Sequence, residues 1–273
     1  MVNYNAYWRL ARLDKPIGII LLWSPTSWAL WLANHGHPSI KIIIFFLLGT
    51  IIMRSAGCVI NDIADRNFDL HVSRTNMRPL TSGEVSLVAA FLFFILLVGC
   101  AVIILLQLPP ECFLYALLSL LITVIYPFCK RMINSPQLIL SIAFSMSMPM
   151  VYVTAHQSFD KTLLMLWLIN FLWVIAYDTQ YAMVDLYDDK KIAVKSTAVF
   201  FKSWSKTIIV SLQIVLHFLW LPLAWLLDFN NYFFILWFFG GCLFIYQYNL
   251  LYMQAFLNNS WYGLIMWFAI ICG

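Results

Sequence analysis

The side chains best suited to chemistry lie in the stretch 54–78, where an apolar run ends in acidic residues. Asn61, Asp62, Asp65 and Asp69 follow one another closely. At 3.6 residues per turn, Asn61, Asp65 and Asp69 fall close to one face of a helix. Carboxylates held this close repel one another unless a cation neutralises them, so the pattern indicates a cation site.

The types of these side chains indicate which metal would bind and what it would carry. Oxygen ligands without His or Cys suit Mg²⁺ rather than zinc. Arg74 and Arg78 follow the acids, and their guanidinium groups would suit an anion carried by that metal. Arg54 lies inside the apolar run, where a structural ion pair is one interpretation. The other is an anchor for a small anion such as a carboxylate.

A second acidic stretch also ends an apolar run, at Asp178, Asp185, Asp188 and Asp189. Of the 12 acidic residues in the chain, seven lie in the two stretches. Asp185 and Asp189 share one helical face, and Asp178 lies two turns earlier and deeper in the run. One acidic helix end is often only a solvated surface. Two of them, with a carboxylate inside the apolar run, favour a functional site.

Tyr126 and Lys130 close another apolar run, four positions apart. A lone lysine at such a helix end is usually a topology anchor, but here it is expected on the same side as both acidic stretches. We therefore interpret Lys130 as a phosphate ligand. The five histidines show no metal-ligand spacing, and there is no Gly-rich phosphate loop, so nucleotide hydrolysis is unsupported.

The composition is that of an integral membrane protein. Of the 273 residues, 63% are hydrophobic and 10% are charged, against roughly 25% charged in soluble domains. Long uninterrupted apolar runs indicate helices rather than barrel strands, whose residues would alternate. The net charge of +4 gives no reason to expect a nucleic acid partner. Six scattered cysteines without a CxxC pair are typical of small apolar residues in helices.

The apolar runs predict an all-α, polytopic membrane bundle of about nine transmembrane helices, folded as a single domain over 1–273. Pro16 suits the first turn of the first helix. The last run is shorter than the roughly 20 residues that a span needs, so whether it forms a full helix stays open. The expected helices cover 16–33, 41–62, 85–106, 111–129, 136–154, 162–184, 207–227, 232–253 and 261–272.

The positions of the basic residues predict the orientation. The N-terminus and the loops after the second, fourth and sixth helices carry 13 of the 16 Lys and Arg residues. The positive-inside rule therefore puts these segments, and both acidic stretches with them, on the cytoplasmic side. Asp65 and Asp185 lie 120 positions apart and end even-numbered helices, which suggests two halves that share a cavity.

These motifs resemble the UbiA superfamily of intramembrane prenyltransferases, over most of the chain. The opening segment RLDKPIGIILLWSPTSWALWLA and the YDTQYAM run are most similar to the branch that uses 4-hydroxybenzoate in ubiquinone synthesis. The other markers are NDIADRNFD at 61–69, RT at 74–75, RPL at 78–80, Tyr126-x-x-x-Lys130, and YDTQYAMVDLYDD at 177–189 followed by Lys195-Ser196.

The resemblance implies nine transmembrane helices around a central cavity that opens sideways to lipid. It also implies Mg²⁺ joining both acidic motifs to an isoprenyl diphosphate. Ala193, where the family is expected to have glycine, and the short last run depart from the pattern. The metal or diphosphate role falls to Asn61, Asp62, Asp65, Asp69, Asp178, Asp185 and Asp189. Diphosphate contacts fall to Arg74, Arg78 and Lys130, and contact with the aromatic acid falls to Arg54. Asn61, Tyr126 and Lys195 are also expected to bind substrate.

The expected function is Mg²⁺-dependent transfer of a polyprenyl group from polyprenyl diphosphate to the ring carbon ortho to the hydroxyl of 4-hydroxybenzoate. The expected location is among the lipids of a bacterial inner membrane, with the site facing the cytoplasm. Catalysis is assigned to Asp65, Asp178, Asp185 and Arg54, with Asp178 as the base. Dihydroxynaphthoate, homogentisate or haem stay open as acceptors. A cation-coupled membrane transporter is the alternative of another class, since intramembrane acids fit both.

Overall fold

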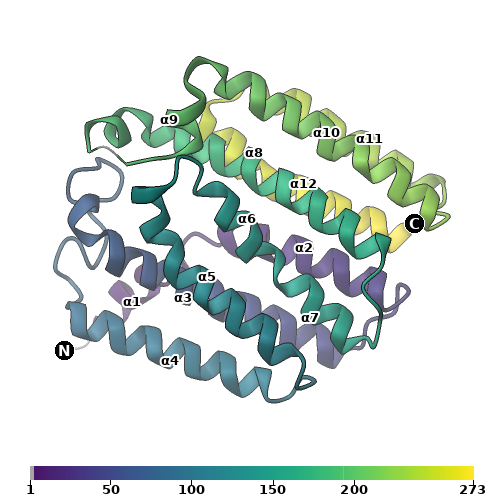
Figure 1. Cartoon of the computed structure of the whole chain (residues 1–273), viewed down its shortest axis with the longest axis horizontal. Coiled ribbons are helices and arrows are strands. Elements are labelled where there is room, and N and C mark those ends of the chain that lie inside the picture. The colour runs from purple at the N-terminus through teal and green to yellow at the C-terminus, as the bar shows by residue number, and fades with distance from the viewer. Residues whose placement is uncertain (1–2, 193) are drawn as a thin grey trace.

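The computed structural model describes residues 3–192 and 194–273, and this part of the chain holds helices and no strand. The helices run roughly parallel or antiparallel, with the N-terminus and the loops after α3 and α8 gathered at one end (Figure 1). They are α1 Tyr4–Leu10, α2 Ile17–Ala33, α3 Ile40–Asp69, α4 Leu87–Leu105, α5 Cys112–Met132, α6 Gln137–Ser145, α7 Ser147–Thr154, α8 Lys161–Lys191, α9 Thr197–Phe201, the 3₁₀ turn η1 Lys202–Trp204, α10 Ser205–Leu226, α11 Asn231–Gln247 and α12 Tyr252–Cys272.

The core is centred on α8, which packs against α2, α6, α10 and α12. The ring centroid of Trp28 lies there 5.2 Å from that of Trp173 and 5.1 Å from that of Trp220, and none of the three is exposed. A smaller apolar cluster joins α3 to α4 through residues such as Val59 and Phe94. The bundle therefore has a densely packed side around α8 and a thinner side made by α3, α4 and α5.

The helices that carry the acidic stretches run further than the sequence predicted. We expected a polar loop from about residue 62 and another from about 184, whereas α3 continues to Asp69 and α8 to Lys191. The drop in hydropathy marks where each helix leaves the apolar region rather than where it ends. Both acidic motifs consequently lie on regular helix, which fixes the direction of each carboxylate.

The single helix expected at 136–154 is broken in two at Met146. Pro149 explains the break, because it has no N–H to donate to the carbonyl of Ser145 and its ring would clash with that carbonyl. The Ser145 hydroxyl also contacts the core, since it accepts a hydrogen bond of 2.8 Å from the side chain of Asn170 on α8. The break thus lies against the core and is held there by a polar contact.

The C-terminal run forms a complete helix rather than a short one. We expected a helix to Met253 and another from Trp261, whereas α11 ends at Gln247 and α12 starts at Tyr252. A chain of buried amides explains the difference. Asn259 donates to Gln180 of α8 at 2.8 Å and accepts from Trp173 at 3.0 Å. Polar side chains that the sequence placed in a loop are therefore satisfied inside the bundle.

Seven helical segments among the described residues are long and apolar enough to cross a membrane. The shorter apolar helices Ile17–Ala33 and Asn231–Gln247 have 17 residues each. That length is close to the minimum for a span, about 17 residues. The polytopic helical bundle is therefore confirmed, and the expected number of about nine crossings stays a prediction.

Gly263 provides a test of how tightly α12 packs on this core. A Cβ atom there would overlap Ser24 and lie 2.7 Å from the ring of Trp173. Gly263→Ala should therefore destabilise the detergent-solubilised protein by about 1–3 kcal/mol, as overpacking does. The measurement is the midpoint of thermal unfolding, followed by the loss of monodisperse protein after heating.

Gly99→Ala on α4 is the matched control. A Cβ at Gly99 meets nothing within 4 Å. Because alanine favours a helix over glycine by roughly 0.5–1 kcal/mol, this change should leave stability unchanged or slightly raised. Equal midpoints for the two variants would contradict the packing described here.

Candidate active site

One large cavity, with a volume of about 1340 Å³, runs through the described part of the bundle. Its mouth lies at the end where α3 and α8 finish, and it is lined there by the acidic and basic side chains. Away from the mouth its walls are largely apolar and come from α3, α4, α5 and α7. The two acidic stretches, more than a hundred residues apart in the sequence, therefore open on the same space.

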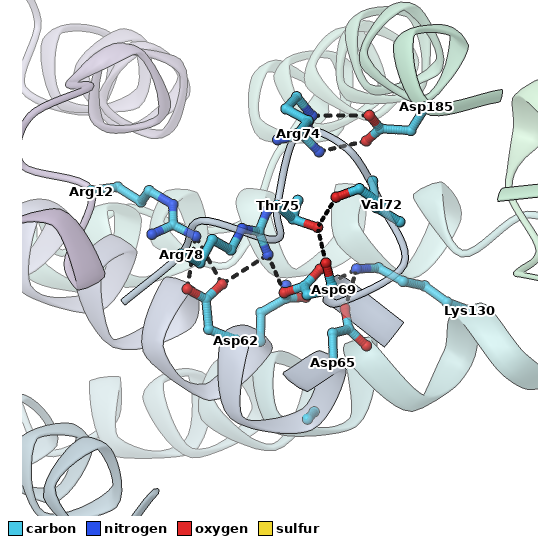
Figure 2. Close-up of polar contacts among 12 residues, drawn as sticks. Arg12, Asp62, Asp65, Asp69, Val72, Arg74, Thr75, Arg78, Lys130 and Asp185 are labelled. Carbon is cyan, nitrogen blue, oxygen red and sulfur yellow. Dashed lines mark hydrogen bonds and ion pairs between the residues drawn. The ribbon is translucent and has the colours of Figure 1, made fainter. Parts of the chain in front are cut away.

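Asp62 is the most deeply buried acid of the mouth, with 1% of its surface exposed. Arg12 donates to both of its carboxylate oxygens at 2.8 Å, and Arg78 donates to one of them at 3.0 Å (Figure 2). Arg12 holds a left-handed backbone conformation, with φ of 57°. Such a conformation is strained for a residue other than glycine, so it is kept only where surrounding contacts fix it.

Asp65 and Asn61 share one ammonium group. Lys130 of α5 lies 2.8 Å from Asp65 and 3.1 Å from the Asn61 carbonyl oxygen. Its Nζ also lies over the ring of Tyr126, 5.3 Å from the centroid. The cation expected to bind phosphate is thus held at the mouth by an aromatic face and two oxygens of the first acidic motif.

Asp69 closes the loop that follows α3. Its carboxylate accepts from Arg78 at 2.7 Å, and its backbone carbonyl accepts from the Thr75 hydroxyl at 3.0 Å. These contacts fold the loop back over the end of α3, as Figure 2 shows. Burial lowers the pKa of the Arg78 guanidinium, but Asp62 and Asp69 more than offset this, so its pKa lies above the ordinary value.

The same loop reaches across the mouth to the second acidic motif. Arg74 donates to both oxygens of Asp185, at 2.9 and 2.5 Å, and lies over the ring of Tyr181. The Ser73 amide donates to Asp188 at 3.1 Å. Burial lowers the pKa of Arg74, but the hydrogen bonds to Asp185 more than offset this and hold it above the ordinary value. Arg74 therefore stays charged and joins the two motifs.

The segment after α8 supplies the last wall of the mouth. Asp189 accepts from the Ser196 hydroxyl at 3.4 Å. The Lys195 side chain lines the cavity, but its ammonium donates to the backbone carbonyl of Met132 at 2.9 Å. Ala193, the expected departure from the family's glycine, lies outside the described residues.

Arg54 and Asp178 lie deeper in the same cavity. The Arg54 guanidinium packs on Gly18, where a Cβ atom would lie 2.8 Å from its Cζ. It also faces the ring of Phe144, 5.9 Å from the centroid. The buried Nε of Arg54 has no hydrogen-bond partner in the described chain. None of the ion pairs found there includes Arg54.

All the site residues predicted from the sequence therefore line one cavity, and their roles stay predictions. Arg12 was not predicted as a site residue, because a basic residue ahead of the first apolar run indicates topology and no more. Tyr181 was also missed as a residue with a role of its own. Its spacing of four from Tyr177 on the face of Asp178 and Asp185 could have indicated it.

The donor set of the mouth fits Mg²⁺ in its chemistry. The side chains offer oxygen atoms, with no His or Cys contributed by the motifs. Across residues 3–192 and 194–273 no three acidic, His or Cys side chains form a metal-binding group. Arginine and lysine lie between the carboxylates instead. Protein Mg²⁺ sites commonly use only one or two carboxylates together with substrate phosphates, so this arrangement suits a metal that enters with a diphosphate.

Known proteins resemble the chain over its whole length. It is 53% identical to the 4-hydroxybenzoate octaprenyltransferase of Legionella pneumophila (strain Paris), a match that covers 99% of this chain and 98% of that protein. The protein of the same name from Tolumonas auensis is 45% identical, over 98% of this chain and 96% of the relative. The one from Vibrio cholerae is 43% identical, over 99% and 98%.

Solved structures share the fold. The apo UbiA homolog from Aeropyrum pernix K1 gives a TM-score of 0.80 at 20% identity, over 92% of this chain and 96% of that one. The UbiA homolog from Archaeoglobus fulgidus bound to GPP and Mg²⁺ gives 0.74 at 17% identity, over 97% and 99%.

The profile of the UbiA prenyltransferase family matches residues 22–270. That range holds both acidic helices and all the cavity-lining residues except those that lie between Arg9 and Leu21. With full-length relatives above 50% identity beside it, the match shows that this chain belongs to the UbiA prenyltransferase family.

Proposed function

We propose that this protein transfers a polyprenyl group from a polyprenyl diphosphate to 4-hydroxybenzoate, at the ring carbon ortho to the hydroxyl. One observation carries the proposal: a single cavity joins a mouth lined by acids and cations to an apolar interior. A diphosphate with an apolar tail needs both environments in one continuous space. Relatives at 43–53% identity that bear the name 4-hydroxybenzoate octaprenyltransferase support this choice of substrates.

The donor binds with its diphosphate in the mouth, where Arg74, Arg78 and Lys130 supply cationic hydrogen-bond donors. These three side chains already bind carboxylates, so they are positioned for an anion. When bound, Mg²⁺ supplies Lewis-acid neutralisation of the leaving diphosphate. The oxygens that would hold it belong to Asn61, Asp62, Asp65, Asp69, Asp185 and Asp189.

Chemistry takes place where the polar mouth meets the apolar interior. The allylic C–O bond breaks and its electron pair leaves with the diphosphate, which the cations stabilise. The apolar walls exclude water that would otherwise quench the carbocation. The ortho ring carbon attacks to form the new C–C bond, and Asp178, on the wall of the same cavity, accepts the ring proton. Diphosphate and one proton are released.

The acceptor binds with its carboxylate against Arg54. Among the described residues this guanidinium forms no ion pair, unlike those of Arg12, Arg74 and Arg78. Phe144, on whose ring it packs, offers an apolar face to an aromatic ring. Family membership favours this enzyme over a cation-coupled transporter, and dihydroxynaphthoate, homogentisate and haem are the other acceptors to compare.

The protein is an integral membrane protein, and we propose the bacterial inner membrane with the mouth facing the cytoplasm. The basic residues support this orientation, since 13 of the 16 lie in segments at the mouth end of the chain's topology. Both the lipid-soluble donor and the prenylated product would then stay in the bilayer.

The proposed metal and diphosphate site is tested by Asp65→Asn and Asp185→Asn. Each change keeps the shape of the side chain but removes a charge at the mouth. In isolated membranes each should lower Mg²⁺-dependent formation of prenylated 4-hydroxybenzoate by about 100-fold or more. The measurement is lipid-extractable product from radiolabelled 4-hydroxybenzoate over a range of Mg²⁺ concentrations.

Asp188→Asn is the matched control, because Asp188 lies in the same helix but does not line the cavity. It should keep wild-type turnover within a few-fold of the starting value, since Asp188 only accepts a hydrogen bond from the Ser73 amide. Wild-type turnover in both Asp65→Asn and Asp185→Asn would remove the assignment of the acids.

The proposed acceptor anchor is tested by Arg54→Gln. Losing a charge-assisted contact should raise the KM for 4-hydroxybenzoate about 10- to 100-fold and leave the KM for the prenyl diphosphate nearly unchanged. Steady-state kinetics with each substrate varied in turn gives both values. An equal rise in both KM values would mean that Arg54 supports the cavity as a whole rather than binding the acid.

A further inference from the structure

Tyr181 lies on α8 between the proposed base and one of the proposed ligands of the metal. It follows Asp178 by three positions and precedes Asp185 by four, so the three side chains share one face of the helix. At 1.5 Å per residue, Tyr181 is roughly 4.5 Å from Asp178 and 6 Å from Asp185 along the helix axis. All three residues line the cavity. Tyr181 therefore lies at the level where the polar mouth meets the deeper part of the cavity.

The ring of Tyr181 is held by its neighbours. The guanidinium of Arg74 lies over it, with Cζ 4.6 Å from the ring centroid, and the ring of Phe256 packs against it with 4.8 Å between the centroids. Arg74 is itself fixed by two hydrogen bonds to Asp185. Because the ring is packed in this way, the hydroxyl is the group of Tyr181 that a substrate can contact.

The hydroxyl of Tyr181 is free to make a hydrogen bond. None of the side-chain hydrogen bonds that α8 makes to the described residues includes it. It is also not one of the covered polar atoms that lack a partner, so it keeps surface that opens on the cavity. The hydroxyl of Tyr177, one turn earlier, likewise has no partner among the described residues, but protein atoms cover it. Of these two tyrosines, Tyr181 is therefore the one whose hydroxyl can contact a bound molecule.

Cations surround the space in front of this hydroxyl. The guanidinium groups of Arg54, Arg74 and Arg78 all lie within electrostatic range of Tyr181. Arg74 and Arg78 belong to the mouth, and Arg54 lies deeper in the cavity. The hydroxyl is therefore near the proposed positions of both the diphosphate and the aromatic acid, where it offers a neutral O–H donor beside the charged ones.

We propose that the Tyr181 hydroxyl donates a hydrogen bond to the diphosphate oxygen that leaves when the allylic C–O bond breaks. The inference rests on the proposed function, since it adds a catalytic residue to the same site. That oxygen gains negative charge as the bond breaks, because the electron pair of the bond goes to it. A hydrogen bond to it is therefore stronger in the transition state than in the bound donor, and such a contact raises kcat. The hydroxyl keeps its proton throughout.

The change that tests the contact is Tyr181→Phe, which removes the hydroxyl but keeps the ring under Arg74. With Mg²⁺, polyprenyl diphosphate and 4-hydroxybenzoate, it should lower kcat about 10- to 100-fold and leave both KM values within about threefold of wild type. Steady-state kinetics of the purified protein gives all three constants. A rise in either KM value without a fall in kcat would overturn the inference.

The matched control is Tyr177→Phe, which removes a covered hydroxyl one turn earlier on the same helix. The phenylalanine ring would keep the contact with Trp173, whose centroid lies 5.2 Å from that of Tyr177. This variant should keep kcat within about threefold of wild type, since the substrates do not reach the lost hydroxyl. Equal falls of kcat in the two variants would contradict the inference, because they would show that the fall comes from altered aromatic packing.

Inorganic diphosphate tests the same contact without turnover. It already carries the charge that the leaving oxygen of the donor gains only in the transition state. Tyr181→Phe should therefore raise the Kd of diphosphate about tenfold in the presence of Mg²⁺, whereas Tyr177→Phe should keep the wild-type Kd. The Kd follows from the rise of the thermal unfolding midpoint with diphosphate concentration in monodisperse, detergent-solubilised protein.

The same Kd in wild type and Tyr181→Phe would overturn the inference even if the enzyme prenylates 4-hydroxybenzoate. Failure of the proposed function gives a different result, since the wild-type protein would then bind diphosphate without prenylating 4-hydroxybenzoate.

Discussion

The neutralisation of buried carboxylates by arginine and lysine is the interaction on which the site depends. Asp62 has almost no exposed surface, and two guanidinium groups are its partners. Removing one partner from a buried pair typically costs about 3–5 kcal/mol, since a charge is left without compensation. Arg12 lies in the turn between α1 and α2, and Arg78 lies in the loop after α3. Their pairing with Asp62 therefore also fixes the two segments that enclose the mouth. That loop in turn places Arg74 on Asp185.

The two sides of the bundle do different work. α8 presents acids to the cavity on one face and packs its other face into tryptophans and buried amides, so it is held along its whole length. The side made by α3, α4 and α5 is more apolar, and residues of all three helices line the cavity. Such an asymmetric wall suits a reaction in which one end of the substrate is held by fixed charges and the other end is held only by apolar contacts.

The sequence was sufficient to predict that the two acidic motifs meet, because each ends an apolar run on the side where basic residues gather. It was not sufficient to predict the role of Arg12, which pairs with Asp62, a residue 50 positions away in the sequence. That pairing depends on the turn in which Arg12 lies. It also misplaced the start of α12. Gln180 and Asn259 satisfy each other across 79 positions, and a local window cannot detect such a partner for a polar residue. Long-range polar contacts account for both of these errors.

The amide chain between α8 and α12 also sets an order of events during synthesis. Gln180 reaches the bilayer well before Asn259 has been translated, and an amide without a partner is costly in hydrocarbon. Until α12 inserts, the side-chain oxygen of Gln180 lacks the donor that Asn259 supplies. Since α12 also lines the cavity, the reaction centre is completed only after this helix has been translated and inserted.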